Sequence, residues 1–196
     1  MNLYSDNNIR SICVFCSSSS SAESVYMESA LELGRGIGKL GVTLVYGGAS
    51  IGLMGQAALG VHEEGGRVIG VLPEFFRKKE IEYLDADELI VTPDMRSRKA
   101  IMEENADAFI ALPGGIGTLE EVTEIFSMIQ LNLMSKPLIL VNINGFFDSL
   151  TNMLNEMVNH RFLKREFMDA LVIVSTPQNA LDYLSSHYKI IPQNKS

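Results

Sequence analysis

The stretch AFIALPGGIGTLEE, Ala108 to Glu121, decides the fold. A short apolar run leads into a loop with three glycines, and Leu119, Val122 and Phe126 begin an amphipathic pattern after the loop. A continuous apolar run of this length is typical of a parallel strand that is buried on both faces. Apolar residues at three- and four-residue steps indicate a helix. The stretch therefore predicts one strand–loop–helix unit.

The same two patterns alternate along the rest of the chain. Six further apolar runs predict strands at Ser11–Cys16, Val42–Gly47, Arg67–Leu72, Glu88–Thr92, Pro137–Asn142 and Leu171–Ser175. Helical patterns cover residues 22–40, 51–64, 95–105, 119–133, 146–159 and 177–187. Such alternation predicts an α/β fold. We expect a single Rossmann-like domain over residues 1–196, a mostly parallel sheet of about seven strands with helices on both faces, and peripheral tails at 1–10 and 189–196.

Composition limits the classes of partner. The chain has 196 residues, of which 46% are hydrophobic and 20% charged, as expected for one soluble domain. A net charge of −8 argues against a nucleic acid polymer as partner, but it allows a small anionic ligand. The first ten residues lack the apolar core of a signal peptide, and no apolar run is long enough to span a membrane. We expect a cytoplasmic protein.

The cysteines and histidines indicate no metal site. Cys13 and Cys16 have C-x-x-C spacing, but both lie in a predicted strand, where residues three apart point to opposite faces. We interpret them as two small buried residues. The three histidines, His62, His160 and His187, are far apart and lack the spacing of a zinc motif. We therefore expect neither a structural metal nor a catalytic triad based on histidine.

Three loops that follow predicted strands are rich in glycine or serine. They are CSSSS at 16–20, YGGASIGLMG at 46–55 and PGGIGTLEE at 113–121, and each precedes a helix. Ligands of parallel α/β sheets bind at the carboxyl ends of the strands. Helix N-termini offer free N–H groups to anions, and glycine allows close approach of the backbone. Together the loops predict a nucleotide or sugar-phosphate site.

The glycine loops match neither of the two common nucleotide motifs. Glu120 stands where a dinucleotide fingerprint starting at Gly115 would have its third glycine. The second predicted strand ends in Tyr46-Gly47-Gly48, without the acidic residue that holds the ribose of NAD. No G-K-[ST] sequence follows a glycine loop, which excludes a P-loop. An NAD-dependent oxidoreductase is thus disfavoured.

Two segments have the spacing of a capping box, in which a Ser or Thr caps a helix and a Glu three residues later reaches back to the cap. They are Ser20 with Glu23 and Thr118 with Glu121. For the second pair, spacing alone favours the structural role. A carboxylate beside a phosphate loop is also well placed for catalysis. Both interpretations of Glu121 remain open at this point.

A cluster of cations lies in DMRSRKAIM, Asp94 to Met102. Arg96, Arg98 and Lys99 occupy the first turns of a predicted helix, where acidic residues are usual. They form either a solvated basic face or a contact to a phosphate or carboxylate. In the second case Arg98 would favour the ionised form of Glu121.

Four motifs together resemble the LONELY GUY family, the cytokinin riboside 5′-monophosphate phosphoribohydrolases long mislabelled as lysine decarboxylases. They are VYGGASIGLMG, DMRSRKAIM, DAFIALPGGIGTLEE and QLNLMSKP, and the similarity runs from about Ile12 to Leu184. The resemblance implies a Rossmann-like homodimer or larger oligomer. It also implies hydrolysis of the N-glycosidic bond of purine nucleoside 5′-monophosphates, either N6-modified adenine ribotides or AMP, which releases the free base and ribose 5-phosphate without a cofactor.

The resemblance also assigns roles to individual residues. Arg98 and Glu121 match the catalytic pair, and Glu121 would act on the sugar and water side of the bond. The residues that match substrate and phosphate contacts are Ser18, Gly48, Glu80, Met95, Lys99, Gly114, Gly115, Ile116, Gly117, Thr118, Leu119, Glu120 and Ser127. Without the resemblance, Glu80 would be a solvated charge and Ser127 a buried helix serine.

The chain departs from the family pattern at five positions. Ser17 and Ala49 replace glycines, Arg96 replaces a histidine, Ile116 replaces a frequent tyrosine and Met128 a frequent tryptophan. These changes leave the preferred base open. They also leave open the alternative of a nucleotide-binding or regulatory protein with weak activity. Met128, Ile129 and Met134 are apolar residues that belong either to a dimer interface or to the core.

Overall fold

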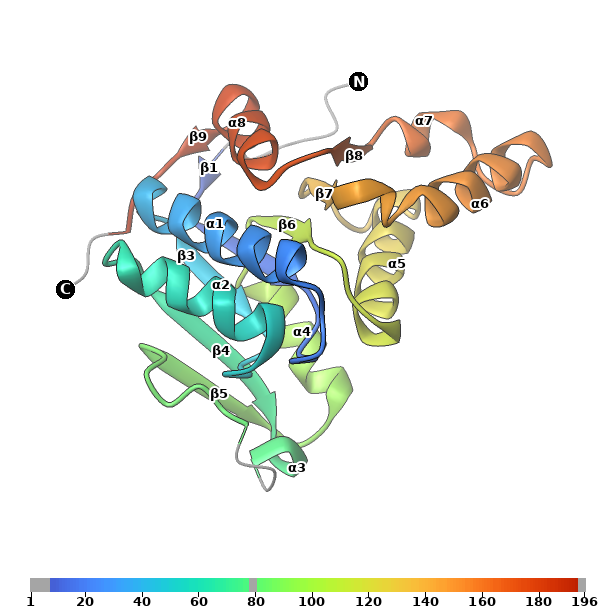
Figure 1. Cartoon of the computed structure of the whole chain (residues 1–196). Coiled ribbons are helices and arrows are strands. Elements are labelled where there is room, and N and C mark those ends of the chain that lie inside the picture. The colour runs from blue at the N-terminus through green and yellow to red at the C-terminus, as the bar shows by residue number, and fades with distance from the viewer. Residues whose placement is uncertain (1–7, 78–80, 194–196) are drawn as a thin grey trace.

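The computed structural model describes residues 8–77 and 81–193, which form a seven-stranded parallel sheet with helices on both sides (Figure 1). The strand order is β5-β4-β3-β2-β6-β7-β8, and every neighbouring pair is parallel. The strands are β2 Ser11–Phe15, β3 Thr43–Tyr46, β4 Val68–Pro73, β5 Glu88–Thr92, β6 Ala108–Ala111, β7 Leu138–Val141 and β8 Leu171–Val174. The predicted α/β fold is confirmed, and each predicted strand lies within one residue of its observed bounds.

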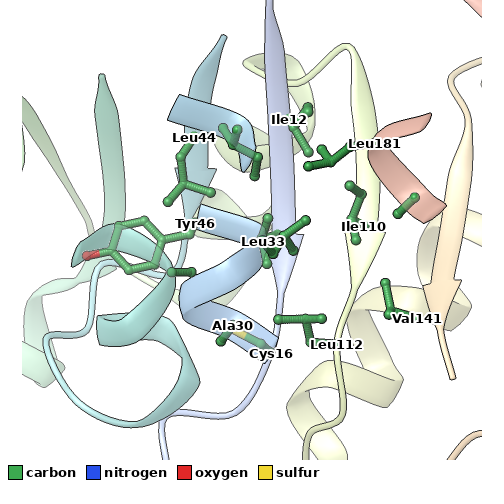
Figure 2. Packing of buried hydrophobic residues seen from close by; sticks show 14 of the residues in the cluster. Ile12, Cys16, Ala30, Leu33, Leu44, Tyr46, Ile110, Leu112, Val141 and Leu181 are labelled. Carbon is green, nitrogen blue, oxygen red and sulfur yellow. The ribbon is translucent and has the colours of Figure 1, made fainter. Parts of the chain in front are cut away.

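Two hydrophobic clusters cover the two faces of the sheet. Alternate residues of β2 illustrate the division, since Ile12 and Val14 belong to one cluster and Cys13 and Phe15 to the other. The first cluster, part of which Figure 2 shows, packs under α1 (Ser24–Leu40), α2 (Gly52–Glu63) and α8 (Pro177–His187). The second packs under α4 (Met95–Glu104), α5 (Ile116–Gln130) and α6 (Asp148–Asn159). The central strands are continuously apolar because both of their faces are covered.

Glycines bring α1 and α2 into close contact. A Cβ atom at Gly34 would lie 2.1 Å from the carbonyl oxygen of Ala57, and one at Gly60 would lie 2.4 Å from that of Leu31. Each helix therefore needs glycine where the backbone of the other approaches it. This packing fixes α2 on the sheet and, with it, the loop that joins β3 to the start of α2.

Three short helical segments were not predicted. They are α3 (Glu74–Arg77) after β4, a 3₁₀ turn at Ile143–Gly145 and α7 (Arg165–Met168) before β8. Each is too short to show a repeating apolar pattern in the sequence. Among the described residues, no helix has the length and apolar character needed to cross a membrane.

The structure corrects the expectation for the described parts of the two tails. β1 (Asn8–Ile9) pairs in parallel with β9 (Lys189–Ile190) and forms a second sheet of two strands. Ile9 is buried in the first cluster, where it contributes to the core. A strand of two residues is too short to show a repeating apolar pattern, so the sequence could not reveal this pairing. It forms because α8 leads the chain back to a position beside β1.

The capping box expected at Ser20 and Glu23 does not form. The N-cap of α1 is Glu23, and no side chain caps this end. The helix therefore starts four residues after Ser20, because Ser19, Ser20 and Ser21 remain in the loop that follows β2. The far end of the predicted helix at 119–133 was also wrong, since α5 ends at Gln130 and Leu133 is 70% exposed.

Candidate active site

A cleft opens at the carboxyl edge of the sheet, at the point where the order of the strands reverses. β2 lies between β3 and β6, so its loop leads toward one half of the sheet while the loop after β6 leads toward the other. This switch point is the usual ligand site of the fold. The cleft has a volume of about 220 Å³ and is lined by Cys16, Ser17, Ser18, Gly47, Ala49, Met54, Leu72, Phe76, Ile81, Met95, Arg98, Gly115, Gly117, Thr118 and Glu121. The three predicted loops meet here.

Arg98 and Glu121 form a buried ion pair in the cleft. The distance from Arg98 Nη1 to Glu121 Oε1 is 2.8 Å, and each side chain is 6% exposed. Arg98 Nε also donates to the carbonyl oxygen of Val71 at 3.1 Å. A Cβ atom at Gly47 would lie 2.1 Å from Arg98 Nη2, so the guanidinium occupies space that only glycine leaves free. Contacts to α5, β4 and the loop after β3 together fix its position.

The helix that carries Arg98 has a cap that the sequence reading missed. Asp94 is the N-cap of α4, and its Oδ1 accepts a hydrogen bond from the Ser97 N–H at 2.8 Å. This acidic cap offsets the unfavourable placement of cations in the first turn. The bond from the Ser97 N–H lowers the pKa of Asp94. Asp94 directly precedes the helix in DMRSRKAIM and is a residue type that commonly caps helices, so the sequence contained the signal for this cap.

Burial governs the protonation of Glu121. Desolvation raises the pKa of its carboxyl above the ordinary value of 4.5, and the charge and hydrogen bond of Arg98 offset only part of that rise. Arg98 thus favours the ionised form of Glu121, as expected, but burial outweighs it and the pKa of the carboxyl is raised overall. A carboxyl with a raised pKa is better suited to accept a proton from water than an ordinary glutamate.

The start of α5 excludes the capping box at Thr118 and Glu121. The N-cap is Gly115, which has an extended conformation and no side chain, so Thr118 is already the third residue of the helix. The backbone N–H groups of Ile116, Gly117 and Thr118 have no hydrogen-bond partner within the described ranges. These donors and the helix dipole make the first turn of α5 an anion site that opens into the cleft.

Thr118 is held over the glycine loop. Thr118 is buried, and a Cβ atom at Gly114 would lie 2.1 Å from Thr118 Oγ1. Gly114 is therefore required for the side chain of Thr118 to fold back onto the loop. Gly114 itself lines a neighbouring depression of about 250 Å³ rather than the cleft.

The cleft brings together seven of the predicted site residues: Ser18, Met95, Arg98, Gly115, Gly117, Thr118 and Glu121. Gly48 lies between two lining residues and has a positive φ of 78°. Ile116 is 81% exposed, and Leu119 and Ser127 are exposed as well, so these three side chains lie outside the cleft of the single chain. Ser127 is thus not the buried helix serine that the pattern alone predicts. Glu80 lies outside the described residues.

Lys99 and Glu120 contact each other outside the cleft. Lys99 Nζ donates to Glu120, and it also lies 2.9 Å from Glu124 Oε2. The nearby Arg96 is exposed, as expected for a solvated face. Of the three cations near the start of α4, only Arg98 lines the cleft.

The apolar wall of the cleft was missed by the sequence reading. Met54, Leu72, Phe76 and Ile81 line it. Leu72 ends a predicted strand and Met54 lies in a glycine-rich stretch, so the sequence could have placed both residues at the site. Ile81 comes from a stretch rich in charge, and it reaches the cleft because the chain runs back beside residues 48–50. Ser50 N–H donates to the Ile81 carbonyl at 2.8 Å, and Tyr83 N–H to that of Gly48 at 2.9 Å.

The two cysteines are free and buried, as predicted. Cys13 and Cys16 belong to opposite hydrophobic clusters, although Cys16 also lines the cleft. Burial raises the pKa of the Cys16 thiol far above its usual value, so a reactive thiolate is not formed there.

Comparison with known proteins identifies the family. The family described as "Possible lysine decarboxylase" matches residues 54–184. The chain is 42% identical over 171 residues to a cytokinin riboside 5′-monophosphate phosphoribohydrolase of Arabidopsis thaliana, which covers 87% of this chain and 78% of the relative. It is 37% identical over 193 residues to a probable cytokinin riboside 5′-monophosphate phosphoribohydrolase of Oryza sativa subsp. japonica, with 96% of this chain and 79% of the relative covered.

Solved structures agree on the fold. The molybdenum cofactor binding protein of the phototrophic bacterium Rippkaea orientalis superposes with a TM-score of 0.71 and is 26% identical, and the match covers 91% of this chain and 96% of that protein. The motifs, the fold and the relatives agree with the resemblance inferred from the sequence. The chain belongs to the LONELY GUY family, whose curated members include the cytokinin riboside 5′-monophosphate phosphoribohydrolases.

Proposed function

We propose that this protein hydrolyses the N-glycosidic bond of purine nucleoside 5′-monophosphates and releases the free base and ribose 5-phosphate. One observation carries the proposal. The buried carboxylate of Glu121 lies one helical turn, or roughly 5 Å, beyond the free N–H groups at the start of α5. A phosphate on those donors would bring the attached ribose to the carboxylate. The names of the relatives support the same reaction.

Arg98 and Glu121 supply the chemistry of the proposed reaction. As the C1′–N bond breaks, positive charge develops on the sugar, and a carboxylate beside it stabilises that charge. Glu121 accepts a proton from the attacking water, for which its raised pKa is suited. Arg98 positions the carboxylate through the 2.8 Å contact and adds positive charge for nucleotide binding. The electron pair of the broken bond leaves with the base nitrogen, which takes a proton from solvent.

The phosphate is bound mainly by backbone in this proposal. The N–H groups of Ile116, Gly117 and Thr118 provide the donors, and Ser18 faces them from the loop after β2. Only the backbone of Ile116 is needed, which agrees with the exposure of its side chain. Contacts from Lys99, Glu80, Leu119, Glu120 and Ser127 stay predictions of the family resemblance.

The base is bound by the apolar wall. Met54, Leu72, Phe76 and Ile81 offer surface for an uncharged ring but no charged group to select one. This wall is suited to adenine and to adenine with an apolar N6 substituent. The two substrates differ in the apolar area that they bury, which makes affinity the property to compare.

We also infer a homodimer. Leu131 and Leu133, at the end of α5, are 62% and 70% exposed, and an apolar patch of this kind favours self-association. Ile129 is part of the core and does not contribute to that surface. Light scattering of the purified protein tests the oligomeric state. The cytoplasmic location stays a prediction of the sequence.

A substrate panel tests the proposed reaction. Purified protein is incubated with AMP, isopentenyladenosine monophosphate and adenosine, and free base and ribose 5-phosphate are measured. We expect release from the monophosphates and little from adenosine, which lacks the phosphate that the start of α5 would bind. Binding of the monophosphates without release of base would contradict the hydrolase and support the nucleotide-binding alternative.

A further inference from the structure

Glu121 lines a second, smaller cavity on the side away from the cleft. This rear crevice lies between α4 and α5, has a volume of about 10 Å³ and is lined by Phe15, Lys99, Glu103, Glu121, Glu124 and Ile125. Its volume is close to the minimum that accommodates one water molecule, and its polar side chains are suited to hold one. The carboxyl group of Glu121 therefore stands between two compartments.

Glu121 lines both cavities, and only one of its carboxylate oxygens is engaged by Arg98. Oε1 accepts the hydrogen bond from Arg98, and Oε2 makes no hydrogen bond to the residues that the structure describes. The side chain is only 6% exposed. Under the proposed function a nucleotide fills the front cleft during turnover. The rear crevice then provides the route by which the buried carboxyl of Glu121 exchanges a proton with solvent.

The charged groups around the crevice differ in how they are engaged. From α4, Arg98 contacts Glu121, and Lys99 contacts Glu120 and Glu124 of α5. Glu103, also on α4, has no side-chain hydrogen bond within residues 8–77 and 81–193. Only its backbone carbonyl is engaged, by Lys136 Nζ at 2.9 Å.

Glu103 has the properties of a group that accepts and releases protons. It is partly buried, and burial raises the pKa of its carboxyl, while Lys136 offsets part of the rise and Glu124 adds to it. Burial raises the pKa of the Glu121 carboxyl as well, so the pKa values of both groups shift in the same direction. Glu124 is less suited to this task because its Oε2 is already engaged by Lys99 Nζ at 2.9 Å.

We propose that Glu103, together with one water in the rear crevice, carries the proton from Glu121 to solvent during hydrolysis. The inference rests on the proposed function. Glu121 takes a proton from the attacking water as the O–C1′ bond forms and the C1′–N bond breaks. It passes that proton to the crevice water, which gives one to Glu103, and Glu103 releases it to solvent. The departing base takes one proton from solvent, so the overall reaction consumes one water and leaves the proton count unchanged.

Glu103 acts through Glu121 in this scheme and is a positioning and relay residue, not one that touches the nucleotide. The test is Glu103→Gln, which keeps the size of the side chain and removes its titration. Glu104→Gln is the matched control because Glu104 is the next residue on α4, is exposed and does not line the crevice. Both variants and the wild type are assayed for kcat and KM with AMP, with and without added sodium formate.

We expect Glu103→Gln to lower kcat by about tenfold at neutral pH with an unchanged KM, since proton transfer and not binding is affected. Glu103→Ala, assayed in the same way, leaves space where the carboxyl stood, so formate should restore the kcat of this variant in a saturable manner. Formate should leave the wild type, Glu103→Gln and Glu104→Gln unaffected, and these three proteins should unfold at the same temperature.

Two results would overturn the relay: a kcat for Glu103→Gln equal to that of the wild type, or a loss of kcat in Glu103→Ala that formate does not restore. A wild type that releases no base from any purine monophosphate would instead overturn the proposed function, and the relay with it. The two failures are therefore distinguishable by the wild type alone.

Discussion

Of the cation–carboxylate contacts that join α4 to α5, Arg98–Glu121 and Lys99–Glu120 lie one residue apart on both helices but in different environments. Arg98 and Glu121 are each 6% exposed, whereas Lys99 is 15% and Glu120 50% exposed. An exposed pair adds little to stability because water solvates both charges. A buried pair costs much desolvation, and the loss of one partner leaves an uncompensated charge. The difference teaches that neighbouring pairs of similar composition can differ in their effect on stability, and the buried pair is the one that we propose for catalysis.

Glu121→Gln should have the largest effect of the changes that test this difference. Because the amide cannot accept a proton from water, we expect base release to fall by roughly a thousandfold or more. The amide oxygen still accepts a hydrogen bond from Arg98, so the protein should remain folded and bind ribose 5-phosphate. Base release and calorimetric binding are the measurements. Glu156→Gln, an exposed change on α6, is the control, and a fully active Glu121→Gln variant would remove the catalytic role.

Arg98→Met compares the two cations directly. It leaves the Glu121 carboxylate buried without a partner, which should cost about 3 kcal/mol of unfolding free energy at neutral pH. Lys99→Met is the matched change, and we expect it to cost under about 1 kcal/mol because its glutamates are solvated. Urea denaturation measures both values. Equal losses would refute the distinction, and a large rise in KM for Lys99→Met would indicate that Lys99 leaves its glutamates to bind phosphate.

The pH dependence of stability tests the environment of the buried pair in another way. The pKa of Glu121 is raised by burial, so the folded state binds a proton more readily than the unfolded state between 4.5 and the raised value. The wild type should therefore lose stability relative to Glu121→Gln as the pH rises through that window. Asp94 has a lowered pKa and the opposite sign, since its contribution is lost as the pH falls. Denaturation of both proteins across the acid range measures the difference, and a constant difference would contradict it.

Gly47→Ala should have the smallest effect of the changes that act on the buried pair. The added methyl group meets Arg98 Nη2 and the end of the Met54 side chain, both of which can move, so we expect a loss of about 1–2 kcal/mol. The same substitution in an Arg98→Met background should cost less, because the guanidinium is gone. A double-mutant cycle measures this coupling. Additive effects would show that Gly47 does not hold Arg98 in place.

The sequence alone was sufficient for the seven strands of the main sheet and for the edge of the sheet at which the loops meet. Apolar runs that are buried on both faces leave a clear local pattern, and the order of elements then restricts the topology. The proposed catalytic pair came from the family resemblance and not from spacing. On spacing, Thr118 and Glu121 favoured a capping box, which failed because Gly115 begins the helix. A glycine N-cap makes no side-chain hydrogen bond, so the spacing of residues in the sequence does not identify it.

What the sequence determined by itself was the α/β fold, the position of the PGGIGT loop between a strand and a helix, and the residue types in that loop. Only the tertiary structure decided that Arg98 reaches Glu121, 23 positions away, and that burial outweighs that arginine in setting the pKa of Glu121. It also decided that Ile81 builds the cleft wall and that Glu103 lies behind the carboxylate. Local patterns report backbone conformation, whereas desolvation and contact depend on atoms brought together from distant parts of the chain.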